Sequence, residues 1–566
     1  MRRILAVIAL SSLVSLSMAQ QTYDVPVLET EEPMATGQYE PTWESLSQFQ
    51  TPEWFRDAKF GIWAHWGPQC VEGSGDWMAR ELYMEGTEKY KYHLGNYGHP
   101  SEVGFKDILP LFKAENWDPE KLVNFYKDVV GAQYFFALGN HHDNFDLWDS
   151  QYQEWNSMNI GPKKDILKGW SEAAKKAGLP FGISFHADHA WTWYEPSRRY
   201  DLNGDKTAVP YDGWLTKEDG YKPNADGSEK WWKGLDPQKL YAQDHPFSEG
   251  TWANGMIHRQ WGWENGACPP SQWFATNFYN RTLDAINRYN PDLIYFDVTV
   301  LPFYPVSDAG MKIAAHMYNH HLAETKVKTK TNVPSKKVQN PGIVFGKILT
   351  DEQKEALTWD VERGAPNMIM PEPWQCCNCI GDWHYNTGTY KNDHYKSAQT
   401  VAKLLVDIVS KNGNMLLSVP LRADGTFDEK EEKILREFGA WMQVNKESIV
   451  GTRPWKIFGE GPIAEATIEI NAQGFNDGNY AKAGSEEIRF TQTASNVYVS
   501  ALAWPSDHKI EIKSMKKGSE LFTSNISKVE LLGYGKVKFE RTADALIVSL
   551  PEQPCNTIMP VLKIKK

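Results

Sequence analysis

The chain has 566 residues, a formal net charge of -12 at pH 7 and a sequence pI near 5.7. This length exceeds what one hydrophobic core usually organises, so we expect two folded domains, one of them large enough for a barrel. The acidic balance argues against nucleic acid as a partner. The 24 Trp, 25 Tyr and 24 Phe suit a cleft that stacks aromatic rings on sugar faces, or equally an aromatic core.

The N-terminus is typical of a secretory signal peptide. Residues 1–19 carry Arg2 and Arg3, an apolar run from Ile4 to Leu16, and small residues at the expected cleavage site. The run is too short for a membrane anchor. We therefore expect an exported protein, periplasmic or extracellular, with no membrane partner. Residues 20–45 are polar and without periodicity, and we expect an extended lead-in there.

Apolar strands then alternate with amphipathic helices, a pattern that indicates a parallel sheet. The sequence predicts an α/β fold, a (β/α)8-like barrel over residues 46–455 followed by a small C-terminal antiparallel β-sandwich over 456–566, where short runs alternate with period two. The segments 362–364 and 371–386 are interpreted as loops. Barrel strands are predicted at 60–65, 133–138, 181–185, 291–300, 343–349 and 415–420, and sandwich strands at 487–490, 496–501, 509–512, 546–550 and 561–564.

A segment from about residue 194 to 270 is too irregular for a barrel helix and is predicted to be a lid-like insertion. It contains Asp201, Asn203, Asp205 and Asp212 at spacings that partly fit a calcium loop. Lys206 stands where such a loop needs Gly, which weighs against calcium. No cofactor is otherwise required by the sequence.

Polar side chains follow several of the predicted strands. Asp297 interrupts the apolar run that begins at Leu293, and a lone carboxylate there must be paired or face a cleft. In a barrel this end of the strands holds the catalytic groups, although a helix N-cap is an equal alternative on this strand alone. His65 ends the first strand, with a buried structural role as the alternative.

Further histidines follow the next two strands. His141 and His142 follow the second and His186 the third, with Asp188 beside it. We expect the histidines to bind sugar rather than metal, because no Cys or carboxylate is arranged as a third ligand. The cluster Cys376, Cys377 and Cys379 lacks the spacing of structural zinc and is predicted to be a packed loop, with a disulfide left open.

Four motifs in a fixed order resemble glycoside hydrolase family 29, the α-L-fucosidases. They are WFRDAKFGIWAHWG (54–67), FALGNHHDNFDLWDS (136–150), NPDLIYFD (290–297) and NGNMLLSVPLRADG (412–425). The resemblance implies a retaining exo-hydrolase with a pocket for one L-fucose and Asp297 as the nucleophile. It also implies sugar contacts from His65, Trp77, His141, His142 and Arg363, and the same role is expected for His186 and Trp374.

The acid/base is where this chain departs from the resemblance. Many relatives carry a Glu directly after the Trp that matches Trp374, and here that residue is Gln375, which cannot donate a proton usefully. The segment 361–365 resembles the loop that supplies the acid in another branch. Glu362 is therefore the predicted acid/base, with Glu372 second, and His186 or Asp188 after them.

Three functions remain open at this point. The leading one is hydrolysis of terminal fucose from glycans; the substrate partner is then a fucosylated oligosaccharide. A second is action on another α-L-sugar such as α-L-galactose, which differs from fucose by a hydroxyl at C6. A third is a carbohydrate-binding protein that kept the pocket and lost the acid. The oligomeric state does not follow from the sequence.

Overall fold

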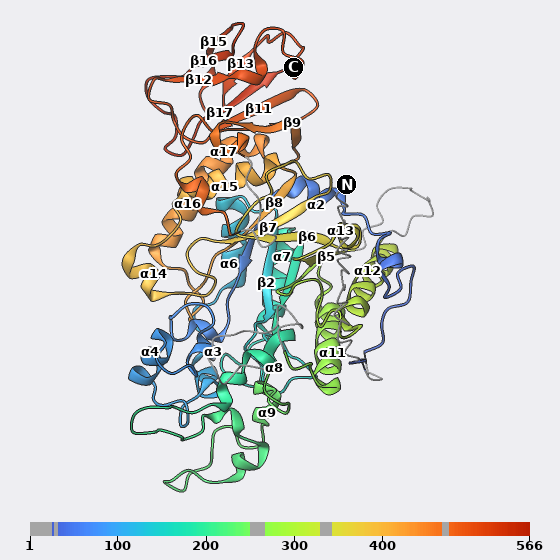
Figure 1. Cartoon of the computed structure of the whole chain (residues 1–566), viewed down its shortest axis with the longest axis vertical. Helices are drawn as coiled ribbons and strands as arrows, with labels where there is room; N and C mark the ends of the chain where they lie inside the picture. Colours follow the sequence, from blue (N-terminus) through green and yellow to red (C-terminus); the bar gives the residue numbers. More distant parts are fainter. Residues whose placement is uncertain (1–24, 28–31, 249–266, 329–341, 467–474) are drawn as a thin grey trace, which may run out of the picture.

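A computed structural model of the protein describes residues 25–27, 32–248, 267–328, 342–466 and 475–566. The predicted signal peptide and residues 249–266 of the predicted insertion lie outside these ranges. The C-terminal strands, the barrel and the insertion follow one another along the long axis, with the C-terminal strands at the top of Figure 1 and the insertion, in green, at the bottom. Among the described residues, no helix combines the length and the apolar character needed to cross a bilayer.

Eight parallel strands close into a barrel in chain order, and the predicted fold class is confirmed. Parallel neighbours need a crossover connection, which the intervening helices supply. Closure is seen at Ile62, which pairs with Phe135 on one side and with Leu417 on the other. The barrel strands are β1 (Phe60–Ala64), β2 (Tyr134–Asn140), β3 (Phe181–Phe185), β4 (Leu293–Phe296), β5 (Ile343–Gly346), β6 (Thr358–Glu362), β7 (Trp374–Cys379) and β8 (Gly413–Ser418).

Strand β7 lies where the sequence predicts a loop, and that prediction is wrong; β6, which overlaps a predicted loop only at Glu362, is a strand that the sequence does not predict. The strands escape notice because polar residues occupy buried positions on them. Gln375 Nε2 donates to Asp360 Oδ2 at 2.9 Å, and Tyr134 Oη donates to Gln375 Oε1 at 3.0 Å, so these polar groups pair inside the barrel. The cysteine cluster is part of β7 rather than a loop, and all six cysteines, each among the described residues, are unpaired.

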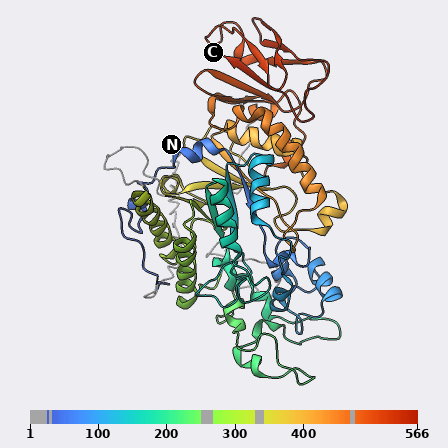
Figure 2. The same ribbon diagram turned by 180° about the vertical axis from the view of Figure 1, so that it is seen from behind.

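The barrel helices begin and end at the residues that their capping chemistry indicates. Asp165 accepts the Lys168 amide at the start of α7, and Gly178 adopts the left-handed conformation that ends it. Seen from behind in Figure 2, α11 and α12 flank one side of the barrel and α15 and α16 the other. The long helices are α7 (Ile166–Ala177), α11 (Gln272–Tyr289), α12 (Ala309–Lys328), α15 (Ala398–Ser410) and α16 (Glu429–Asn445); shorter ones near the barrel are α1 (Trp43–Leu46), α2 (Glu53–Ala58), α3 (Met78–Glu81), α6 (Pro119–Asn124) and α13 (Asp351–Ala356).

The C-terminal part is the predicted antiparallel sandwich. A six-stranded sheet and a three-stranded sheet share an apolar core that includes Phe490, Val499, Ile512 and Val548. The strands are β9 (Arg453–Glu460), β10 (Ile488–Gln492), β11 (Asn496–Ala501), β12 (Lys509–Ile512), β13 (Val529–Leu531), β14 (Gly535–Lys536), β15 (Lys538–Arg541), β16 (Leu546–Ser549) and β17 (Val561–Lys565).

Helix α15 joins the sandwich to the barrel by packing against β9 and β10. Its buried Asp407 is paired with Lys411, at 2.8 Å, and with Arg489 of β10.

Candidate active site

A pocket of about 520 Å³ opens where the barrel strands end at their carboxyl termini, which is where barrel enzymes place their sites. Its lining combines aromatic and charged side chains. The lining residues are Trp63, His65, Asp76, Trp77, His141, His186, Tyr295, Asp297, Lys347, Ile348, Glu362, Trp383 and Phe475.

Asp297 lines the pocket, one residue beyond the end of β4. His142 Nε2 lies 3.2 Å and His186 Nδ1 lies 3.5 Å from its Oδ2, and the Lys347 ammonium contacts its Oδ1. Burial raises the pKa of Asp297, but the Lys347 charge and the two imidazoles outweigh it and hold the pKa well below its ordinary value. Asp297 is therefore an ionised, oriented carboxylate.

Lys347 links Asp297 to Glu362. Its ammonium donates to Glu362 Oε2 at 2.8 Å as well as to Asp297. Burial disfavours the ammonium, yet the two carboxylates more than offset it and raise the pKa of Lys347 well above its ordinary value. Because both carboxylates reach one nitrogen atom, they lie within the short spacing, about 5 Å, of retaining glycosidases.

The predicted histidines converge on this pocket. His65, His141 and His186 line it, and His142 reaches it through its contact with Asp297. Burial, followed by the neighbouring histidines, lowers the pKa of His65 and His141 well below the ordinary value, and burial lowers that of His186 to about 4 despite Asp297. These three rings are therefore neutral and can each donate and accept a hydrogen bond.

Asp76 and His384 lie beside two of the predicted histidines, and we call His65, Asp76, His141 and His384 the polar wall of the pocket. His384 Nδ1 lies 2.7 Å and His141 Nε2 lies 3.6 Å from Asp76 Oδ1. Burial raises the pKa of Asp76, but the His384 contact outweighs it and the pKa lies below its ordinary value. The expectation that no carboxylate accompanies the histidines is thus wrong: Asp76 is distant from them in sequence and lies beside two of them in space.

Two predicted site residues are placed away from the pocket. Glu372 precedes β7 and is exposed at the amino-terminal end of the barrel, among Ser47, Glu53 and Lys354. Trp374 is the first residue of β7, and its indole donates to the Lys411 carbonyl at 2.9 Å. A strand of six residues separates both from the catalytic end, so neither can contact a sugar beside Asp297.

Arg363 ends outside the pocket lining. Its guanidinium pairs with Asp477 at 3.3 Å and lies over the Phe475 ring. A left-handed backbone at Arg363, with φ of 50°, turns the chain after β6. The side chain therefore packs against Phe475, a pocket residue, and the sugar contact that the resemblance implies for Arg363 stays a prediction.

Gln375 does not occupy the pocket either. It is fully buried in the barrel interior, bonded to Tyr134 and Asp360 as described above. The replacement of Glu by Gln at this position therefore removes no carboxyl group from the site.

Asp188 is fully buried, and neither carboxyl oxygen has a hydrogen-bond partner. Burial and the Asp297 charge raise the pKa of Asp188 well above its ordinary value, so this carboxyl is neutral. It does not line the pocket.

The predicted calcium ligands point to different partners. Asp201 bonds to His99, at 2.9 Å, and to two tyrosines, whereas Asp212 bonds to Lys106 at 3.1 Å. Asn203 donates to Glu85 at 3.1 Å. Asp205 is exposed, and among the described residues none of these carboxylates belongs to a cluster of three potential ligands within 4.8 Å of one another. Within the described part of the insertion no residue lines the pocket, so a lid is not seen there.

Sequence reasoning missed several pocket residues. Lys347 could have been found, because it interrupts an apolar run, Ile343 to Leu349, as Asp297 does. His384 and Trp383 follow β7, whose strand character was not recognised. Phe475 comes from beyond the barrel, and no local signal marks it.

A neutral imidazole cluster, aromatic walls and two closely spaced carboxylates at the end of a (β/α)8 barrel define a glycosidase-type site. Family models match the chain over most of its length: "Alpha-L-fucosidase" over residues 27–447 and "Alpha-L-fucosidase C-terminal domain" over 482–565. The chain belongs to the α-L-fucosidase family, glycoside hydrolase family 29, and is a glycoside hydrolase.

Curated relatives extend over nearly the whole chain. The tissue alpha-L-fucosidase of Homo sapiens is 23% identical over 528 residues, covering 92% of this chain and 89% of that protein. The plasma alpha-L-fucosidase of Homo sapiens is 24% identical over 535 residues, covering 92% and 91%.

Solved structures share the fold. The crystal structure of the Thermotoga maritima alpha-fucosidase superposes with a TM-score of 0.62 at 23% identity, covering 93% of this chain and all of that one. A covalent intermediate of a Bacteroides thetaiotaomicron alpha-L-fucosidase superposes with a TM-score of 0.53 at 17% identity, covering 95% and 99%.

Proposed function

We propose that this enzyme removes terminal α-L-fucose from glycans by double displacement, with Asp297 as the nucleophile and Glu362 as the acid/base. The observation that carries the proposal is the placement of the two carboxylates on either side of Lys347 in one pocket. Spacing this short leaves no room for a water between carboxylate and sugar, which favours retention over inversion.

In the first step, an Asp297 oxygen attacks the anomeric carbon and the glycosidic C–O bond breaks. Glu362 gives its proton to the departing oxygen. In the second step, Glu362 takes a proton from water as the water oxygen bonds to the anomeric carbon, and the Asp297 ester bond breaks.

Lys347 assists both steps through its charge. Before the reaction it keeps Asp297 ionised, as a nucleophile must be. Once Asp297 is esterified, its charge is gone, and the ammonium still contacts Glu362 Oε2, which orients the carboxyl group that acts as base.

The polar wall holds the sugar hydroxyls in this proposal. His65 and His141 each offer a donor and an acceptor, and Asp76 is an acceptor. Trp63 and Tyr295 supply apolar surface for the sugar ring and the C6 methyl group. We also propose export, from the signal-peptide pattern, and catalysis that needs no metal.

An α-L-galactosidase stays the second candidate, because the pocket contains several polar groups that could face a C6 hydroxyl. A binding protein without chemistry is disfavoured, because its support was Gln375, which lies outside the pocket.

Turnover of aryl α-L-fucoside and aryl α-L-galactoside by the purified protein tests the proposal. We expect the fucoside to be preferred by at least about 10-fold in kcat/KM, as an apolar wall for a methyl group predicts. The initial sugar product, observed by NMR, should be the α-anomer. Preference for the galactoside, or an initial β-anomer, would contradict it.

A further inference from the structure

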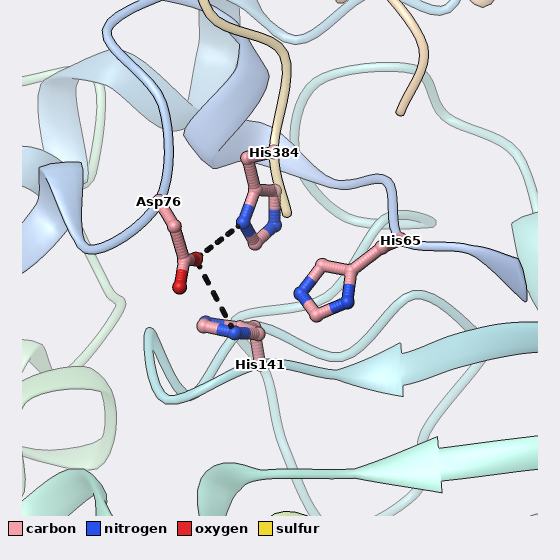
Figure 3. Close-up of side chains that lie close together, drawn as sticks. All are labelled: His65, Asp76, His141 and His384. Carbon is pink, nitrogen blue, oxygen red and sulfur yellow. Dashed lines mark hydrogen bonds and ion pairs between the residues drawn. The ribbon is translucent and has the colours of Figure 1, made fainter. Parts of the chain in front are cut away.

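Four side chains with metal-ligating atoms face one another at the polar wall of the pocket (Figure 3). His65 follows β1, Asp76 lies ahead of α3, His141 follows β2 and His384 follows β7. One ligand atom from each lies within 4.8 Å of those from the other three. Three imidazoles and a carboxylate are a ligand set that Zn²⁺ binds in proteins.

The cluster has unused ligand capacity. Both ring nitrogens of His65 and Nε2 of His384 are buried and have no hydrogen-bond partner. An unpaired buried nitrogen costs free energy that a bound ligand would recover. Asp76 remains partly exposed, so the wall can be reached from the pocket.

His141 also turns one ring nitrogen toward the other members of the cluster. Gln69 lies 2.6 Å from His141 Nδ1. The Gln69 amide nitrogen faces Nδ1, because its Oε1 accepts the Ala79 amide, and this contact orients the ring so that Nε2 faces Asp76 at 3.6 Å.

We propose that His65, Asp76, His141 and His384 bind a transition-metal dication of the Zn²⁺ class, and that the ion inhibits the enzyme by taking the groups that hold the sugar hydroxyls. Zn²⁺ ligands lie about 2 Å from the ion, so binding draws the side chains closer than they stand here. The ion would be an inhibitor, because Asp297 and Glu362 already supply the chemistry. The inhibition rests on the proposed function, whereas metal binding does not.

Binding is tested first, with Co²⁺ as a spectroscopic probe of the EDTA-treated, dialysed full-length protein. We expect one Co²⁺ per chain, visible absorption bands typical of four-coordinate Co²⁺, and their loss when Zn²⁺ displaces it. His384→Ala should weaken binding at least about 100-fold, since it removes a direct ligand. His394→Ala, an exposed histidine after α14 (Thr387–Asn392), is the matched control and should leave binding unchanged.

Two further variants test whether the loss of binding is caused by misfolding and whether a neighbouring site binds the ion. Asp76→Asn keeps the shape of the side chain and should also weaken Co²⁺ binding, with an unchanged circular dichroism spectrum. His142→Asn tests the alternative group formed by His141, His142 and His186. Loss of binding in His142→Asn but not in His384→Ala would overturn the proposed ligand set, as would the absence of saturable Co²⁺ binding to the wild type.

Inhibition is tested second. Zn²⁺ should raise the KM for aryl α-L-fucoside without lowering kcat, EDTA should reverse the effect, and the His394→Ala control should respond as the wild type does. Zn²⁺ binding by a protein that hydrolyses no α-L-fucoside would refute the proposed function and leave the metal site standing. Zn²⁺ binding with unchanged KM would refute the inhibition.

Discussion

Lys347 sits between the two carboxylates on which the proposed chemistry depends. Two ionised carboxylates this close would otherwise repel each other and share a proton, as paired acids do in other hydrolases. The ammonium contacts both groups and holds Asp297 in the ionised form in which it attacks the sugar. The separate roles proposed for Asp297 and Glu362 therefore depend on a third residue, Lys347.

The pH dependence follows from that arrangement. Lys347 lowers the pKa of Asp297, so Asp297 stays ionised at acidic pH. In Lys347→Met this pKa should rise, and the acid limb of the kcat/KM profile should move to higher pH, with an overall loss of about 100-fold or more. Lys168→Met, an exposed residue of α7, serves as control. An acid limb unmoved in Lys347→Met would contradict the assigned role.

Glu362 as acid/base makes a different prediction. Glu362→Gln should slow natural fucosyl oligosaccharides far more, by about 100-fold or more, than aryl fucosides whose leaving groups need little proton assistance. Added azide should attack the glycosyl-enzyme in place of water, speed the second step and yield α-fucosyl azide. Glu372→Gln, at the opposite end of the barrel, should behave as the wild type. Equal slowing of both substrate classes by Glu362→Gln would argue that another group is the acid.

At the scale of the elements, the sequence predicts those strands that are apolar and misses those that are not. Asp297 and the histidines after the first three strands could be predicted as site residues, because apolar runs next to them mark the strands that they follow. β6 and β7 could not be predicted, because their buried Asp360 and Gln375 form a hydrogen bond with each other across the two strands. Neither segment alone shows that pairing. Asp76 and His384 were missed for the same reason.

The buried Asp360 carboxyl on β6 makes the stability of the folded chain depend on pH. Burial, opposed in part by Lys347, raises its pKa to about 6. Because the folded-state pKa is raised, Asp360 favours folding when protonated, and this contribution is lost as pH rises from about 4 to about 6. Asp360→Asn should therefore increase stability at pH 8 by about 2 kcal/mol and change it little at pH 4. Urea unfolding at the two pH values measures this; equal effects at both would contradict it.

At the scale of the whole molecule, the site draws on residues beyond the barrel. The backbone amides of Phe475 and Asp477 bond to the carbonyls of Glu362 and Arg363, each at 3.0 Å. Residues 475–477, which lie between the sandwich strands β9 and β10, thus hold the end of β6, and they bring Phe475 to the pocket. The pocket crosses the domain boundary predicted at residue 456.

Phe475 should therefore affect substrate binding. Its ring lines the pocket and is 53% exposed, which suits stacking on a sugar beyond the cleaved bond. In Phe475→Ala, the KM for a fucosyl oligosaccharide should rise about 10-fold, with a smaller effect on aryl fucoside. Tyr534→Ala, an equally exposed aromatic of the sandwich, is the control. An unchanged KM in Phe475→Ala would remove this residue from the site.

The most direct test of the account is to trap the sugar on the enzyme. After incubation with 2-fluoro-fucosyl fluoride, mass spectrometry of the wild-type chain should show one added 2-fluorofucosyl group, and peptide mapping should place it on Asp297. Asp297→Ala should gain no label. A label on another carboxylate, or hydrolysis of α-L-fucosides by Asp297→Ala at the wild-type rate, would contradict the assignment of Asp297 as the nucleophile.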